Sequence, residues 1–251
     1  MKVLITAGAS GIGLAIADAF LSARSHVHIA DLSADAIDRV RGRHERLTAS
    51  PCDVGDPVQV AALEEVVADR LGGLDVLVNN AGIGGPRAPI DEISDDAWAA
   101  TFRVNVTGAF HAIRTFAPWF KRQRSGCIIN ISSTSARTGL PDRTAYVASK
   151  GAMESMTMNL ARELGPFNIR CNALLPGSIE NERGRRLLAD RAARDGISYE
   201  AALAERLRFI SMRTRIEPSE IGETAVFLAS DAARHITGQR LSVCGNAEWE
   251  G

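Results

Sequence analysis

The sequence predicts an α/β fold: a doubly wound parallel sheet formed by a single domain over residues 1–251. Short apolar runs alternate with segments of helical periodicity from end to end, which is typical of repeated β-α units. The apolar runs are hydrophobic at almost every position, and this indicates strands buried on both faces of a parallel sheet. No linker, repeat or low-complexity stretch divides the chain, so one domain is expected.

The predicted elements follow in a regular order. Strands are expected at residues 3–6, 27–30, 47–49, 76–79, 127–131, 169–174 and 240–243. Helices are expected at residues 11–23, 34–43, 57–71, 95–120, 145–164 and 220–229. Residues 178–215 are the exception, because they are charged, contain no strand and are too long for an ordinary connection. They predict a helical substrate-loop insertion or lid.

Composition narrows the function classes. Hydrophobic residues make up 45% and charged residues 24% of the chain, values typical of a soluble globular protein. The formal net charge of −1 argues against a nucleic-acid or membrane partner. The uncharged residues 3–17 are fewer than the ~20 of a membrane span. The four cysteines and five histidines are scattered without ligand spacing, so no metal site and a reducing, cytoplasmic location are expected.

The segment TAGASGIG, from Thr6 to Gly13, follows the first predicted strand and opens the first predicted helix. Its glycines do not form G-x-G-x-x-G, but Gly11 and Gly13 leave room for a pyrophosphate at a helix N-terminus. Asp31 follows eighteen residues after Gly13, at the end of the second strand, where a carboxylate can bind ribose hydroxyls. These features favour a dinucleotide loop, and the alternative is a tight turn in an unrelated α/β protein.

Tyr146 and Lys150 stand four residues apart in a predicted helix, so they share one face. A phenol has a pKa of about 10 and is a poor base at neutral pH. A nearby ammonium favours the phenolate, and the pair can then exchange a proton with an alcohol or carbonyl oxygen. The chain has 26 arginines and only 3 lysines, so abundance does not explain this lysine. The alternative is an ordinary pair on a helix surface.

Three further segments establish a family resemblance: NNAG at residues 79–82, Asp53 before Val54, and YVASK at residues 146–150. With the glycine loop, they make the chain resemble the short-chain dehydrogenase/reductase family over essentially its whole length. That family has a Rossmann-like fold and a T-G-x-x-x-G-x-G loop. Here Ala7 stands where the family usually has glycine, with a glycine displaced to Gly8. We expect an intact loop with a slightly altered backbone.

The resemblance implies the site residues. The second serine of SS, Ser133, would hold the substrate oxygen. Asn105 would support a water relay to Lys150. From residue type alone, the alternative for Asn105 is a buried, hydrogen-bonded asparagine with a structural role. The implied catalytic residues are Asn105, Ser133, Tyr146 and Lys150. The implied cofactor-binding residues are Thr6, Ser10, Gly11, Ile12, Gly13, Asp31, Leu32, Asp53, Val54, Asn80, Ala81, Gly82, Tyr146, Lys150, Pro176, Gly177 and Ile179.

The cofactor is expected to be NAD. Asp31 would repel a 2′-phosphate, and neither Ser10 nor Leu32 is basic, whereas NADP-preferring relatives typically carry Arg or Lys at one of those places. Pro176-Gly177 matches the family's turn on the nicotinamide side. Asn181 replaces the threonine that usually follows four residues after the glycine.

Arginines suggest the substrate class. Arg143 resembles a pocket-lining position of the family, so the expected substrate-binding residues are Ser133, Arg143 and Tyr146. Arg87 lies in the loop after NNAG, and residues 182–215 carry nine arginines against five acids. An anionic or polyhydroxylated substrate is expected. The alternatives are a solvated helix face for the nine arginines and a turn cap for Arg87.

The favoured function is an NAD-dependent dehydrogenase or reductase acting on a small polar secondary alcohol or ketone. One alternative is a 3-oxoacyl carrier-protein reductase, which usually shows NADP features. Another is an inactive nucleotide-binding interaction protein, which the complete Asn-Ser-Tyr-Lys set disfavours. A homotetramer is expected because the family commonly pairs two long helices, here 95–120 and 145–164. The tail SVCGNAEWEG, with Trp249 and with Cys244 in place of the usual aspartate, would help to bury a subunit contact.

Overall fold

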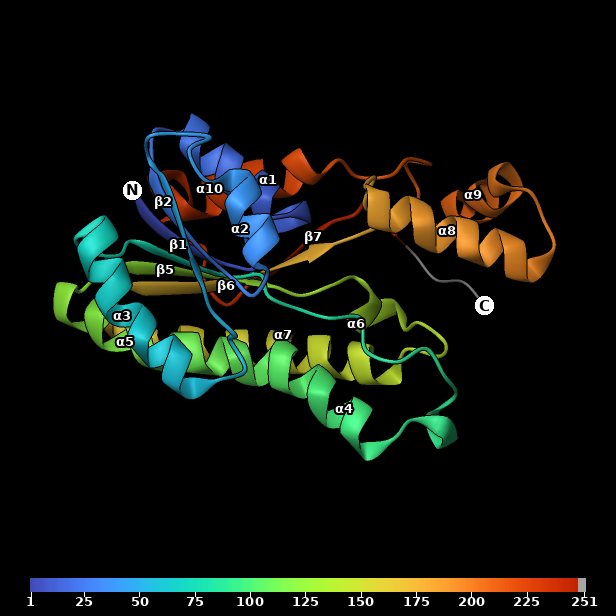
Figure 1. The fold of residues 1–251 in the computed structure, drawn as a ribbon, viewed down its shortest axis with the longest axis horizontal. Coiled ribbons are helices and arrows are strands. Elements are labelled where there is room, and N and C mark those ends of the chain that lie inside the picture. The colour runs from blue at the N-terminus through green and yellow to red at the C-terminus, as the bar shows by residue number, and fades with distance from the viewer. Residues whose placement is uncertain (248–251) are drawn as a thin grey trace.

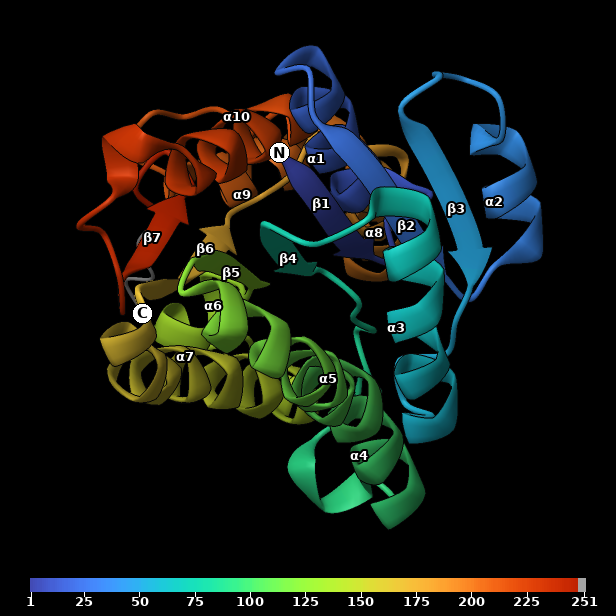
Figure 2. The same cartoon turned by 90° about the vertical axis from the view of Figure 1, so that its left-hand side faces the viewer.

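The computed structural model describes residues 1–247, apart from the side chain of Arg183. Its centre is a parallel sheet of seven strands within that range, in the order β3-β2-β1-β4-β5-β6-β7 (Figures 1 and 2). The strands are β1 (Lys2–Thr6), β2 (His26–Asp31), β3 (Leu47–Pro51), β4 (Val76–Asn79), β5 (Gly126–Ile131), β6 (Ile169–Pro176) and β7 (Arg240–Val243). All seven strands predicted from the sequence are therefore confirmed.

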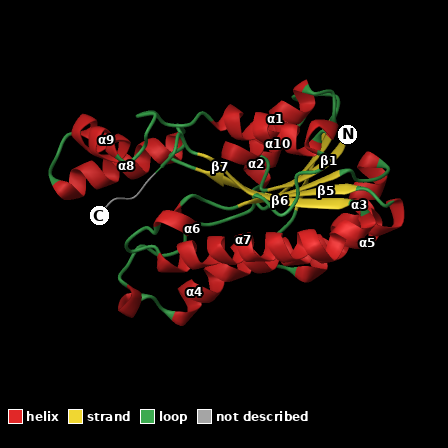
Figure 3. Ribbon diagram, turned by 180° about the vertical axis from the view of Figure 1, so that it is seen from behind, coloured by secondary structure: helices red, strands yellow, loops and turns green. Residues whose placement is uncertain are grey.

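Helices cover both faces of the sheet, which makes the fold doubly wound and Rossmann-like (Figure 3). One layer holds α1 (Gly11–Ser22), α2 (Ala34–Val40) and α10 (Pro218–Ala229). The other holds α3 (Pro57–Leu71), α5 (Gly108–Gln123) and α7 (Thr144–Leu164). The side chains of β1 alternate between the layers: Val3 and Ile5 pack in the first and Leu4 in the second. This explains why the strands are apolar at consecutive positions.

Two predicted helices differ from the structure. The helix predicted at residues 95–120 is α4 (Asp95–Phe102), a π-helical turn η2 (Arg103–Thr107) and then α5. The helix predicted at residues 34–43 ends at Val40, because Arg41 is extended and Gly42 has a φ of 75°. Short helices that were not predicted are η1 (Ile90–Glu92), α6 (Ser135–Thr138), η3 (Gly165–Phe167) and η4 (Asp231–Ala233).

The predicted helical insertion is confirmed as the pair α8 (Glu182–Asp195) and α9 (Tyr199–Arg208), which projects beyond the carboxyl ends of the strands (Figure 1). Leu188, Ala192 and Ala202 form a small apolar cluster between the two helices. Two isolated bridges hold the base of the pair: Ile179 with Ile216, and Ile210 with Ala247. Within residues 1–247, no helix has the length and hydropathy needed to cross a membrane.

Candidate functional site

The carboxyl ends of β1 and β4 mark the point where the strand order reverses, since the chain proceeds outward from β1 on one side and from β4 on the other. Such a switch point is where ligands bind in open α/β sheets. Thr6, at the end of β1, accepts hydrogen bonds at Oγ1 from the backbone N–H groups of Asn80 (3.0 Å) and Ala81 (3.1 Å). The Asn80 amide donates in turn to the carbonyls of Thr6 (3.1 Å) and Ala7 (2.9 Å). The glycine loop and the NNAG segment therefore form one hydrogen-bonded unit.

The loop backbone accommodates Ala7 at the position where the family usually has glycine. Ala7 has a φ of 50°, in the left-handed region that favours glycine, so the conformation is kept by a residue that tolerates it less well. Gly13 has no room for a side chain, because a Cβ there would lie 2.5 Å from Asn80 Nδ2. A Cβ at Gly11 would have no atom within 4 Å. Gly13 thus lets the loop pack closely against Asn80, and Gly11 leaves the outer side of the loop open.

The start of α1 offers free amide groups to an anion. Ser10 is the N-cap residue, yet its side chain makes no capping hydrogen bond. The first N–H groups of a helix have no partner within the helix, and together with the helix dipole they favour phosphate. Gly11 and Ile12 stand at this end. The open side at Gly11 and the uncapped amides fit the pyrophosphate of a nicotinamide dinucleotide.

Asp31 ends β2 beside this loop. Its carboxylate accepts from the backbone N–H of Ala9 (3.0 Å) and from that of Ser33 (3.0 Å). Leu32 is 72% exposed beside it, so no cation covers the carboxylate from that position. Asp53 follows β3 by two residues. Its carboxylate accepts from Arg103 (2.9 Å) and from the N–H of Gly55 (2.8 Å). The hydrogen bond from Arg103 holds the pKa of Asp53 below its usual value.

Asn105 lies in the π-helical turn and is fully buried. Its Oδ1 accepts from the backbone N–H of Ile83 (2.7 Å), and its Nδ2 donates to the Ile83 carbonyl (3.0 Å) and to Ser149 Oγ (2.9 Å). Ser149 Oγ donates to the Tyr146 carbonyl (2.7 Å). Asn105 therefore joins the NNAG loop to the helix of Tyr146 and Lys150.

Lys150 is 4% exposed and donates from Nζ to the Ile131 carbonyl at the end of β5 (2.8 Å). Its Nζ is 5.8 Å from the centre of the Tyr146 ring. A Cβ added at Gly82 would lie 3.3 Å from Lys150 Nζ and 3.4 Å from Asn105 Oδ1. The ammonium and the Asn105 carbonyl oxygen thus approach the same small space beside Gly82, and the tyrosine lies one helical turn away.

The two serines after β5 point differently. The Ser132 hydroxyl donates to the Lys150 carbonyl (3.0 Å) and is 3.4 Å from Glu154 Oε1, so it belongs to the protein interior. The half-buried Ser133 has its Oγ 2.8 Å from Ser135 Oγ. Of the two, Ser133 is the less buried hydroxyl at the carboxyl end of the sheet.

Pro176 ends β6, and Gly177 donates its N–H to the Val243 carbonyl (2.9 Å). A Cβ at Gly177 would lie 2.6 Å from Cys244 Cβ, so the glycine packs against the residue that replaces the family's aspartate. Ile179 forms the bridge to Ile216. Asn181 Oδ1 caps α8 by accepting from the Gly184 N–H (2.7 Å). Trp249 lies outside the described residues.

Arg143 stands just before α7 and faces the site. Its Nη2 donates to the Gly84 carbonyl (2.7 Å), and its guanidinium carbon is 5.5 Å from the centre of the Tyr146 ring. Arg87 is exposed in the loop that follows Gly84. Arg143 thus lies beside Tyr146 but also holds the loop after NNAG.

Several arginines of the insertion bind acids of the same segment. Arg191 contacts Glu205 (2.6 Å) and Asp195 (3.1 Å), and Arg185 contacts Glu180 (2.6 Å). The Arg215 side chain is 8% exposed and contacts Glu180 at 2.5 Å, so it is a structural cation and not part of a solvated face.

Sequence reasoning missed two residues that organise the site. Ser149 connects Asn105 to the Tyr146 backbone, and Arg103 binds the Asp53 carboxylate. The position of Ser149 within YVASK was a usable signal, because it lies next to Lys150 in the motif. Arg103 carried no such signal, since its partner is 50 residues away in the sequence. Among the described residues, no group of three or more potential ligands is arranged to hold a metal ion.

Comparisons with known proteins identify the family and the fold. A family model described as Enoyl-(Acyl carrier protein) reductase matches residues 6–245. The chain is 34% identical to 2,3-dihydro-2,3-dihydroxybenzoate dehydrogenase of Bacillus subtilis (strain 168), over 97% of this chain and 94% of that protein. NAD⁺-bound xylitol dehydrogenase superposes with a TM-score of 0.90 at 29% identity, covering 97% of both chains. An actinorhodin polyketide ketoreductase with NADPH superposes with a TM-score of 0.90 at 28% identity, covering 97% of this chain and 95% of that one.

The fold and the comparisons define an oxidoreductase of the doubly wound class. The chain belongs to the short-chain dehydrogenase/reductase family. Enzymes of this family are oxidoreductases that act on alcohols and ketones with a nicotinamide cofactor.

Proposed function

We propose that this protein is an NAD-dependent dehydrogenase that oxidises a secondary alcohol on a small polar substrate, anionic or polyhydroxylated, and reduces the ketone in the reverse direction. The observation that carries the proposal is the convergence of Lys150 Nζ and Asn105 Oδ1 beside Gly82, one helical turn from Tyr146. A structural role alone does not require a buried ammonium next to a phenol at the mouth of a nucleotide loop.

The cofactor would be held by the loop and by the carboxyl ends of the neighbouring strands. Gly11, Ile12 and Gly13 would receive the pyrophosphate, and Asp31 the adenosine ribose. Residues Asn80 to Gly82 and Pro176 to Ile179 would flank the nicotinamide side. When bound, the cofactor supplies a hydride acceptor or donor. The chain's own residues position the substrate and move its proton.

Tyr146 would take the proton from the substrate hydroxyl, and Ser133 would hold the same oxygen by a hydrogen bond. Lys150 would favour the phenolate form of Tyr146 through its positive charge. The Ile131 carbonyl keeps the ammonium in place (2.8 Å), and Asn105 lines the space beside it where a proton-relaying water would sit. In this arrangement the proton taken up by Tyr146 would pass along Lys150 and the water beside Asn105, on the side away from the substrate.

We propose NAD rather than NADP as the cofactor because of the negative charge at Asp31. A 2′-phosphate would meet the Asp31 carboxylate, and the exposed Leu32 and Ser10 supply no cation to offset the repulsion. A carboxylate held by two backbone N–H groups is already oriented, so it can accept from ribose hydroxyls without ordering a flexible side chain.

A second candidate is reduction of a 3-oxoacyl group on an acyl carrier protein. The likeness to a polyketide ketoreductase supports it. The two candidates differ in substrate size, and NADP features are usual for the second. Steady-state assays with NAD and NADP, over a panel of small hydroxy acids, polyols and a 3-oxoacyl thioester, separate them. Higher kcat/KM with NADPH and the thioester would replace the first proposal by the second.

We also propose a homotetramer, in which α5, α7 and the carboxyl-terminal tail contribute subunit contacts. Phe110 on α5 and Met158 on α7 are large apolar side chains exposed at 45% and 40%. Light scattering at micromolar concentration gives the mass directly, and a monomeric mass contradicts the proposal.

A further inference from the structure

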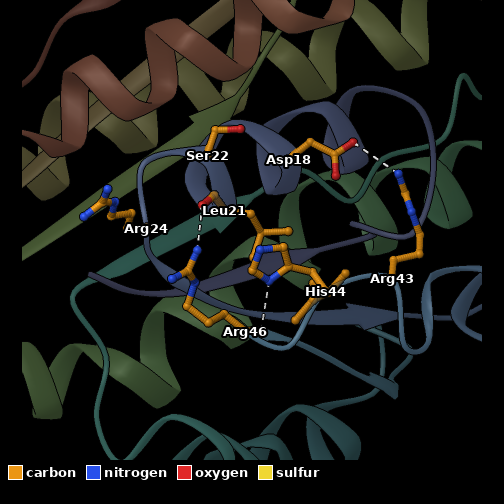
Figure 4. Close-up of a pocket in the computed structure, with 8 residues that line it drawn as sticks. Asp18, Leu21, Ser22, Arg24, Arg43, His44 and Arg46 are labelled. Carbon is orange, nitrogen blue, oxygen red and sulfur yellow. Dashed lines mark hydrogen bonds and ion pairs between the residues drawn. The ribbon is translucent and has the colours of Figure 1, made fainter.

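A hollow of about 490 Å³ lies at the amino ends of β2 and β3, away from the proposed cofactor site (Figure 4). The end of α1 and the turn before β3 line it: Asp18, Leu21, Ser22 and Arg24 on one side, and Arg43, His44, Arg46 and Leu47 on the other. Asp31 stands at the opposite end of β2, which is six residues long, or about 20 Å. A ligand here is therefore separate from the cofactor.

Basic residues dominate the lining. Arg24, Arg43, His44 and Arg46 line the hollow together with one carboxylate, that of Asp18. Asp18 is 3.7 Å from Arg43, and both side chains are about half exposed, so this ion pair is weak. Figure 4 shows the His44 ring between the side chains of Arg43 and Arg46. The hollow thus keeps an excess of positive charge.

Arg46 is under-satisfied as a donor within the described residues. Its Nε is buried and has no hydrogen-bond partner, and its Nη2 reaches the Leu21 carbonyl only at 3.5 Å. A guanidinium N–H without an acceptor loses the hydrogen bond that it makes to water in the unfolded chain. An oxyanion in the hollow would offer strong acceptors to the part of the Arg46 guanidinium that lines it.

The turn that carries these groups is ordered by its own backbone. His44 Nδ1 accepts from the Arg46 N–H (3.0 Å), and the Arg46 carbonyl accepts from the Val27 N–H at the start of β2 (2.8 Å). Because Nδ1 is an acceptor, a neutral His44 carries its proton on Nε2 and is a donor there. The Leu21 carbonyl, which would repel an anion, already accepts from the Arg24 N–H (2.9 Å).

We propose that the hollow binds a phosphate group, either free or carried by a small phosphorylated molecule, with Arg43, His44 and Arg46 as donors. Two guanidiniums and an imidazole match the several acceptor oxygens and the double negative charge of phosphate.

The test is the thermal stability of the full-length protein as chloride is replaced by inorganic phosphate at constant pH and ionic strength. A second series uses glycerol phosphate, and the tighter of the two identifies the source of the group. We expect saturable stabilisation. The variant carrying Arg43→Gln and Arg46→Gln should bind at least tenfold more weakly. The matched control carries Arg39→Gln and Arg41→Gln, which removes the same charge from exposed positions outside the hollow.

If phosphate binding is weakened equally in both double variants, or in neither, the anion binds elsewhere and the proposal is wrong. Stabilisation that never saturates with phosphate concentration also contradicts it. If the double variant does not fold, Arg43→Gln alone serves, because that side chain is 45% exposed. A crystal soaked in phosphate gives an independent answer. A tetrahedral ion within hydrogen-bond distance of Arg43 or Arg46 supports the site, and an empty hollow at saturating phosphate contradicts it.

Discussion

The side-chain amide of Asn105 donates a hydrogen bond to Ser149 Oγ across 2.9 Å, and so ties the π-helical turn to the helix that carries Tyr146 and Lys150. The same side chain binds both backbone groups of Ile83. One buried residue therefore connects the loop after β4 to the helix of the proposed proton-transfer pair.

Asn105→Ala should lower both activity and stability. The substitution removes the hydrogen bonds of Asn105 with the Ile83 N–H, the Ile83 carbonyl and Ser149 Oγ, and each contributes about 0.5–1.5 kcal/mol to stability. We expect kcat to fall at least tenfold. Urea unfolding and steady-state kinetics measure the two effects. Thr107→Ala, at an exposed position of the same turn, is the control and should change neither. Unchanged kcat in Asn105→Ala would exclude the relay.

Tyr146→Phe should reduce kcat by the ~10² or more that is typical of losing a general acid or base. The ring remains, so cofactor binding should survive, as a fluorescence titration with NADH would measure. Tyr199→Phe is a matched control, because Tyr199 begins α9 and is the only other tyrosine of the chain. Similar losses in the two variants would mean that the phenol of Tyr146 has no special role.

The cofactor preference should follow the charge beside β2. Asp31→Ala combined with Leu32→Arg removes the repulsion and adds a partner for a 2′-phosphate, so the ratio of kcat/KM should move toward NADP. Asp31→Ala alone also removes the acceptor of the Ala9 N–H, and it should weaken binding of both cofactors. Kinetics of the unmodified enzyme with each cofactor set the reference. A preference for NADP before any substitution would refute our interpretation of Asp31.

Arg143→Ala tests the anionic substrate. If Arg143 binds the anion equally in the ground and transition states, KM should rise with kcat nearly unchanged, and only for substrates that carry the charge. Arg143 also binds the Gly84 carbonyl, so a structural role would raise KM for a neutral analogue by the same factor. The measurement is one anionic substrate against its neutral analogue in both enzymes. Equal losses would remove the anionic-substrate proposal.

His28 should make stability depend on pH. It is buried, and its two ring nitrogens lie 2.8 Å from the hydroxyls of Thr48 and Ser50. Burial, and then the charge of Arg70, lower its pKa from 6.5 to about 4. The unfolded chain therefore binds the proton first, and the stabilisation present above pH 6.5 is lost as the pH falls toward 4. The loss is about 3 kcal/mol.

Chemical denaturation at pH 7.5 and pH 4.5 measures this loss. His28→Gln should show a smaller decrease in unfolding free energy between the two pH values than the unmodified protein. His26→Gln, at the exposed first residue of the same strand, is the control and should leave the decrease unchanged. The same decrease in all three proteins would mean that other groups cause the acid sensitivity.

The sequence was sufficient for the features that depend on local pattern. The period of the apolar residues predicted every strand, and the spacing of Tyr146 and Lys150 placed both on one helix, because neighbours along a helix meet whatever the rest of the chain does. The glycine loop was found for the same reason, since a strand, a turn and a helix in succession already bring its backbone to the right place. The roles of these residues stay predictions until the variants are measured.

Contacts between distant segments could not be predicted in this way. The π-helical turn at Asn105 needs Ile83 and Ser149 on either side of it, and Asp53 meets an arginine 50 residues further along the chain. Gly177 lies against Cys244, and the insertion is held by backbone pairing near Ala247, in a part of the chain that carried no such signal. Amino-acid type and period determined which elements form and which chemistry they carry. Only tertiary packing decided which side chains meet. Hydrogen bonds and close contacts depend on distances of a few ångströms between segments. How far apart two segments lie along the chain does not fix how far apart they lie in space.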